Sequence, residues 1–177
     1  MAGEKVEQLK DSMFTVLDDM TETDYFNIIT FSDGVSHWNP LEKKSEGIVQ
    51  WAQKVIQATK ENKNLAIKHI FGLQAKGGAN MNQAMLEGVK LVKFALQNEK
   101  LPKDVKLMII FLTDGLPSNG ETNGEAIKNN IKNSNVELST PIFSIVFGKD
   151  ADFDLIKEIS TNFLSSLVHL LRIIIHY

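Results

Sequence analysis

The sequence has no cysteine among its 177 residues. This absence excludes disulfide bonds, thiolate metal sites and cysteine nucleophiles, and it leaves the redox compartment of the protein open. The sequence also lacks an excess of charge of one sign, since 19 basic and 22 acidic residues give a net charge of -3. We therefore expect neither a nucleic acid nor an anionic membrane surface as a partner.

Several motifs that carry chemistry are missing as well. The pair Gly77-Gly78 has no third glycine, and no Gly-Lys-Ser/Thr occurs, so no phosphate-binding loop is predicted. No Gly-x-Ser-x-Gly nucleophile elbow occurs. The four histidines show no metal-ligand spacing; they are His37, His69, His169 and His176. No motif argues for an enzyme, although aspartate and histidine side chains that are distant in sequence can converge in a fold.

No leader and no transmembrane span is expected. Met1 leads directly into a polar, amphipathic segment, which is not typical of a signal peptide. The apolar stretch 163–177 is shorter than the about 20 residues of a membrane helix, and His169 and Arg172 interrupt it. Its three consecutive isoleucines favour β structure, so we predict a strand at 171–177. A membrane-binding or partner-binding helix is the alternative.

A run of six apolar residues, Leu107 to Leu112, is the main structural signal that the sequence does contain. Because no polar residue interrupts it, the run predicts a strand that is buried on both faces, as in a parallel sheet covered by helices. Thr113-Asp114-Gly115 follows, and ligands of open α/β sheets bind outside the carboxyl ends of the strands. Asp114 is therefore a candidate site residue. The alternative is that Asp114 only caps the loop.

Strands and helices alternate along the rest of the chain. Strands are predicted at 25–31, 35–38 and 142–147, and helices at 4–20, 45–60, 81–96, 123–134 and 152–160. Asn80 is expected to cap the third of these helices, the short strand 35–38 is expected at an edge, and the segment 64–71 stays ambiguous. The alternation predicts one α/β domain with a doubly wound, mainly parallel sheet flanked by helices.

Three stretches, in this order and spacing, resemble a von Willebrand factor type A domain: Phe26–Ser32, Gly77–Asn82 and Leu112–Glu121. The resemblance is specifically to the type A domain of the inter-α-trypsin inhibitor heavy chains. It covers residues 1–160 and leaves 161–177 as a divergent apolar tail that can form a last strand. It implies a Rossmann-like sheet with one antiparallel edge strand, which in this chain lacks the first central strand.

The resemblance also implies a metal-ion-dependent adhesion site that binds Mg²⁺ at the top of the sheet through hydroxyls and carboxylates. Only Asp114 matches a ligand position of that site. Ala79 stands where the family has a threonine, and the family's Asp-x-Ser-x-Ser loop would fall before or at Met1. Asn80 or Asn82 has an oxygen to offer, but the family does not predict this. We therefore predict weak or no Mg²⁺ binding, because one carboxylate does not satisfy an octahedral ion.

On this resemblance we expect a non-catalytic adhesion or protein-binding module that is secreted and associates with the extracellular matrix, notably hyaluronan. Its partner would be an extracellular protein or matrix ligand, and no feature indicates an oligomeric state. The absent strand leads us to expect a truncated or alternatively spliced product or an incomplete gene model. The tail would supply the last strand or fill the vacant central position. Two alternatives remain, a small α/β hydrolase-like enzyme using Asp114 and an intracellular type A scaffold domain.

Overall fold

The computed structural model describes residues 4–40, 55–74, 77–99, 101–147, 153–160 and 170–176. The elements in chain order are α1 (Glu4–Asp18), β1 (Tyr25–Phe31), β2 (Val35–His37), β3 (Ile56–Gln57), α2 (Lys60–Phe71), α3 (Met81–Asn98), β4 (Lys106–Thr113), α4 (Gly124–Asn135), β5 (Ile142–Val146), α5 (Phe153–Ile159) and β6 (Leu170–His176). The strands form one sheet with the order β2-β1-β6-β4-β5, and β3 also pairs with β1. Among the described strands, β2 and β3 pair with β1 in antiparallel orientation, and the other pairings are parallel. The predicted α/β class and its antiparallel edge strand are confirmed.

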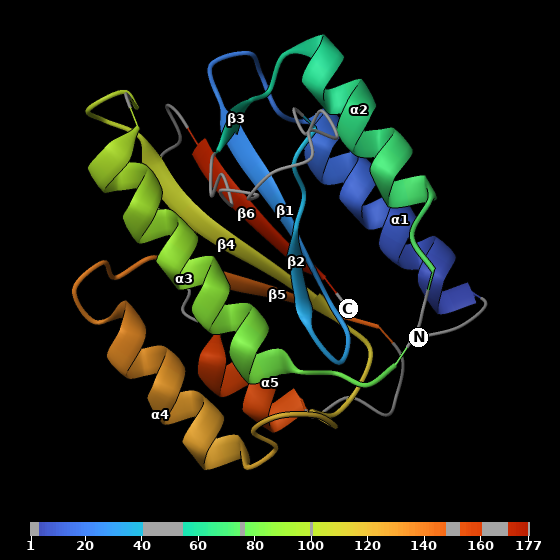
Figure 1. Cartoon of the computed structure of the whole chain (residues 1–177), viewed down its shortest axis with the longest axis vertical. Helices are drawn as coiled ribbons and strands as arrows, with labels where there is room; N and C mark the ends of the chain where they lie inside the picture. Colours follow the sequence, from blue (N-terminus) through green and yellow to red (C-terminus); the bar gives the residue numbers. More distant parts are fainter. Residues whose placement is uncertain are drawn as a thin grey trace, which may run out of the picture.

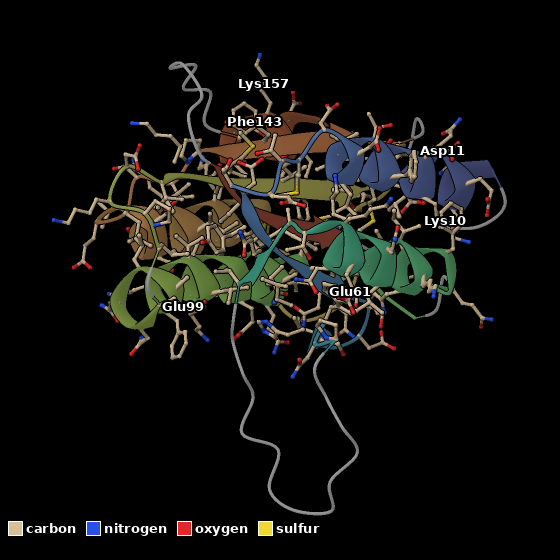
Figure 2. All side chains as sticks on the ribbon, turned by 90° about the horizontal axis from the view of Figure 1, so that it is seen from above. Lys10, Asp11, Glu61, Glu99, Phe143 and Lys157 are labelled. Atoms are coloured by element: carbon tan, nitrogen blue, oxygen red, sulfur yellow. The ribbon has the colours of Figure 1, made fainter. Side chains whose placement is uncertain are left out.

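Two layers of helices cover the two faces of the sheet (Figure 1). Helices α1 and α2 pack on one face, and α3, α4 and α5 pack on the other. In β4, Ile109 and Phe111 belong to the core under α3 to α5, whereas Ile110 and Leu112 belong to the core under α1 and α2. Helices cover both faces of β4, so the central part of its sequence does not alternate between apolar and polar residues. Figure 2 shows Lys157 of α5 on the outside of this sandwich.

Strand β6 lies in the middle of the sheet, although it is the last element of the chain. It pairs in parallel with β1, from Tyr25↔Leu171 to Thr30↔His176, and with β4, from Lys106↔Leu170 to Leu112↔His176. The predicted strand at 171–177 is thus confirmed over residues 171–176, and it occupies the central position that the resemblance leaves vacant. The alternative of a helix is wrong for residues 170–176. With β6 in place, neither β1 nor β4 presents an open edge there.

The helix predicted at 45–60 is wrong over residues 55–59. Ile56 and Gln57 form β3, which pairs antiparallel with Tyr25 and Phe26 of β1. The apolar spacing of this segment is compatible with a helix, but pairing with β1 satisfies its backbone instead. The first part of that prediction, 41–54, lies outside the described residues.

The ambiguous segment 64–71 is helical and belongs to α2. Thr59 caps this helix, since its hydroxyl accepts a hydrogen bond from the backbone N–H of Asn62 at 3.2 Å. None of the described helices is long and apolar enough to cross a membrane.

Candidate functional site

Three loops meet at the end of the sheet where the parallel strands have their carboxyl ends. We call these loops together the rim. They are the turn 32–34 after β1, the segment 77–80 before α3 and the loop 114–120 after β4. The backbone N–H of Asn80 donates to the carbonyl oxygen of Ser32 at 2.9 Å, and that of Ser118 donates to the carbonyl of Ala79 at 3.1 Å. In return, Ala79 N–H donates to Ser118 Oγ at 2.8 Å. The segment 77–80 is therefore held from both sides.

Asp33 connects all three rim loops. Its Oδ1 accepts a hydrogen bond from the backbone N–H of Gly78 at 2.7 Å and another from Nδ2 of Asn119 at 2.9 Å. These two bonds, the Gly78 bond being the larger influence, lower the pKa of the Asp33 carboxyl group below its ordinary value. The sequence analysis treated Ser32-Asp33-Gly34 only as a strand-ending turn. The signal that could have found Asp33 was its place at the carboxyl end of the buried strand β1.

Gly77 lies against Asp33 and has a backbone that favours glycine. Its φ angle is +77°, in the left-handed region. A Cβ atom built at Gly77 would meet Oδ2 of Asp33 at 2.5 Å. Gly77 and Gly78 thus allow their backbone to approach the carboxylate of Asp33 closely.

Asp114 stands at the end of β4, as predicted, and its side chain is 8% exposed. The ammonium nitrogen of Lys5 lies 3.8 Å from Oδ2 of Asp114, while the Lys5 side chain is 33% exposed. Lys5 belongs to the first turn of α1, where the helix dipole disfavours a positive charge. The Asp114 carboxylate offsets this unfavourable interaction. Sequence reasoning identified Asp114 but missed Lys5, because the two residues are distant in the chain.

Ala79 gives the rim no side-chain ligand for a metal ion. Its side chain is buried and has no oxygen, and its N–H group already donates to Ser118. Mg²⁺ requires several oxygen ligands in a near-octahedral arrangement around the ion. Among the described residues, no group of three or more His, Cys, Asp or Glu side chains converges in a way that could hold a metal.

The two asparagines that have an oxygen to offer are engaged elsewhere. Oδ1 of Asn80 caps α3 by accepting from the backbone N–H of Gln83 at 3.3 Å. Oδ1 of Asn82 accepts from Nδ2 of Asn130 on α4 at 3.2 Å. The described rim residues therefore do not fit Mg²⁺. That the chain binds Mg²⁺ weakly or not at all stays a prediction.

A hollow of about 680 Å³ lies elsewhere, between α4, α5 and the start of β5. Its wall includes Ile131, Ile142 and Ile159, with Lys128 and Lys132 at its margin. Lys128 is paired with Glu125 and Glu158 at 2.7 and 3.0 Å. Because α4 ends and β5 begins there, the hollow lies at the amino ends of the parallel strands, opposite the rim. Ligands of open α/β sheets bind at the carboxyl ends, so the rim and not the hollow is the candidate site.

Comparison with known proteins agrees with this fold. A sequence profile described as "von Willebrand factor type A domain" matches residues 1–168. A solved structure, "von Willebrand factor type A from Catenulispora acidiphila", superposes with a TM-score of 0.66 at 16% identity, over 96% of this chain and 34% of that chain. At that identity the likeness shows the fold alone.

The chain also matches inter-alpha-trypsin inhibitor heavy chains. The chain is similar to "Inter-alpha-trypsin inhibitor heavy chain H4" of Homo sapiens, with 34% identity over 160 residues, and to heavy chain H3 of Homo sapiens, with 30% identity over 160 residues. Each match covers 90% of this chain and 16% of the relative, so the chain spans about a sixth of their length. Together with the rim at the carboxyl ends of a parallel sheet, these matches show that the chain belongs to the von Willebrand factor type A domain family.

Proposed function

We propose that this type A domain is a non-catalytic adhesion or protein-interaction module that contacts its partner through the rim. Its relationship to the type A domains of the heavy chains supports an interaction role. The observation that carries the use of the rim is the double hydrogen bond of Asp33, which fixes three loops to one another. A surface that is ordered before binding loses less conformational entropy when a partner docks.

Leu116 is the apolar anchor of the proposed contact. It lies on the rim loop two residues after Asp114, and 55% of its surface is exposed. Large side chains that are held in place on an ordered loop supply much of the affinity of protein interfaces.

The proposed partner is an extracellular protein or matrix ligand, with hyaluronan as the first candidate and secretion as the corresponding location. This extends the resemblance to the heavy chains to a chain that spans about a sixth of their length. In this proposal residues 1–160 form the type A unit, and 161–177 form a tail that contributes β6 to the sheet.

Binding can be measured by surface plasmon resonance, with hyaluronan and a basement-membrane extract immobilised on separate channels. We expect Leu116→Asp to weaken binding at least about tenfold, because a charge replaces the apolar anchor. Val136→Asp is the matched control, since Val136 is 68% exposed at the end of α4, at the opposite edge of the sheet. Equal losses in the two variants, or no binding to either surface by the unmodified chain, would contradict the proposal.

The proposal includes an impaired metal site in which Asp114 is the one matching ligand. Isothermal calorimetry with MgCl₂ tests this part directly. We expect no heat that fits a dissociation constant below the millimolar range. Asp114 is the one carboxylate at a ligand position, and the other rim carboxylate, Asp33, accepts hydrogen bonds from Gly78 and Asn119, so most of the octahedral positions are left to water. A micromolar constant that is lost in Asp114→Ala would refute it.

A further inference from the structure

We infer that Lys5 takes the place of a divalent cation beside Asp114, and that Asp33 takes over the linking of the rim loops. The inference rests on the proposed function for the role of the rim, and it adds which residues make that surface independent of metal.

The first step is the charge balance at Asp114. Its carboxylate is nearly buried, and an isolated buried carboxylate is unfavourable unless a positive charge or hydrogen-bond donors compensate it. The ammonium group of Lys5, 3.8 Å away, supplies one positive charge at this place. Lys5 is brought there by the first turn of α1, a position that the helix dipole would otherwise disfavour for a cation.

The second step is mutual exclusion between Lys5 and a metal ion. Mg²⁺ binds carboxylate oxygens at about 2.0–2.1 Å, so an ion on the Oδ2 atom of Asp114 would lie within roughly 6 Å of the ammonium nitrogen. Two like charges that close together in a partly buried site repel each other strongly. With Lys5 where it is, Asp114 is a poor ligand for Mg²⁺ even before the missing threonine is considered.

The third step concerns the loops that a bound ion would hold together. Asp33 accepts from Gly78 and from Asn119, and thereby joins the segment before α3 to the loop after β4. The reciprocal bonds between Ala79 and Ser118 connect the same two loops. Hydrogen bonds between protein groups thus link the same loops that a bound ion would hold together.

A double-mutant cycle tests the charge replacement. We expect Lys5→Met and Asp114→Asn each to lower the thermal midpoint in the absence of metal, and the double variant to lose less than the sum of the two, by on the order of 2 °C or more. Lys5→Arg should retain most of the midpoint, because it keeps the charge. Additive losses in the double variant would overturn the role of Lys5.

Hydrogen exchange tests the role of Asp33. We expect the Gly78 amide to exchange at least about tenfold faster in Asp33→Ala, because the variant removes its acceptor. Asp104→Ala is the control, since Asp104 is an exposed residue in the turn before β4, at the opposite edge of the sheet. An unchanged Gly78 exchange rate, or the same acceleration in the control, would overturn the role of Asp33 in linking the rim loops.

Paramagnetic relaxation of water protons with Mn²⁺ tests metal independence in the unmodified chain. We expect no enhancement above that of Asp114→Asn. A clear enhancement that disappears in Asp114→Asn would show a metal at the place assigned to Lys5 and overturn the inference. All three measurements use the chain without a partner, so a failure of partner binding would sink the proposed function and leave this inference standing.

Discussion

At the scale of single residues, the exposed carboxylate of Asp33 links the rim because it accepts hydrogen bonds from two other loops. Its hydrogen bonds to Gly78 and Asn119 lower its pKa from the ordinary value of 3.8. A carboxyl group whose pKa is lower in the folded state than in the unfolded state stabilises the fold above the unfolded pKa. That contribution is lost as the pH falls through the folded pKa. As the pH falls, Asp33 therefore takes up its proton in the unfolded chain before it does so in the folded chain, and the free energy of unfolding decreases.

We therefore predict that Asp33→Ala lowers the thermal midpoint at pH 7, and that the difference from the unmodified chain shrinks as the pH is taken from 3.8 downward. Thermal unfolding followed by circular dichroism over pH 2 to 7 would measure this. A difference that stays constant down to the lowest pH at which both proteins fold would show that the carboxylate charge is not the cause.

Gly77 is the residue that makes this contact possible. Gly77→Ala should lower the free energy of unfolding by at least about 1 kcal/mol, because alanine is strained in the left-handed region and its Cβ would meet Asp33. Gly34→Ala is the control on the same rim, since a Cβ there meets nothing within 4 Å. We expect the control to stay within about 0.5 kcal/mol in urea unfolding. Equal effects at the two glycines would contradict the strain argument.

At the scale of elements, α3 is the helix that the rim depends on, because its first turn continues directly from the segment 77–80. Its N-cap Asn80 is nearly buried, and its backbone N–H is also bonded to Ser32 across the rim. The comparable cap of α4 is Asn123, whose Oδ1 accepts from the N–H of Ala126 at 2.9 Å and which is exposed. Two caps of the same residue type thus sit in different surroundings.

We predict that Asn80→Ala destabilises the fold by about 1–2 kcal/mol, towards the upper end of the range for a lost N-cap, because the nearly buried Asn80 side chain also donates from Nδ2 to Oε1 of Gln83 at 3.1 Å and both bonds are lost. Asn123→Ala should cost about 0.5–1 kcal/mol, since water can replace the cap at an exposed helix end. Urea unfolding of both variants measures the two values. The reverse order would mean that burial of the cap does not matter here.

The elements that could be predicted from the sequence are those with a strong local period. The apolar run 107–112 and the strand 25–31 contribute side chains to the cores on both faces of the sheet. Helix α3 has an apolar stripe that follows the N-cap Asn80. The segment 55–59 was predicted wrongly because its apolar spacing suits a helix and only its pairing with β1 makes it a strand. Two-residue strands have no pattern of their own.

At the scale of the whole molecule, the position of β6 is the main feature. A strand that comes last in the chain lies between β1 and β4, so the sheet is continuous only when the end of the chain is in place. Strand β2, in contrast, pairs on one side only, with β1, among the described residues.

We predict that the backbone amides of residues 171–175 exchange as slowly as those of β4, and much more slowly than those of β2, because a central strand is bonded on both sides and opens only with global unfolding. Native-state hydrogen exchange followed by mass spectrometry would measure all three strands in one experiment. Exchange of 171–175 at the rate of β2 would show that β6 does not hold the centre of the sheet in solution.

The sequence by itself determined the α/β class, most of the helices and strands, and the place of Asp114, because each follows from a local pattern of buried and exposed residues. It also showed the absence of a threonine at Ala79. Only the tertiary structure decided that Lys5 meets Asp114, that Asp33 joins three loops, and that β6 lies between β1 and β4. The physical reason is that these are contacts between segments tens of residues apart or more, and no local periodicity encodes which distant segment will complete a charge pair, a hydrogen bond or a sheet.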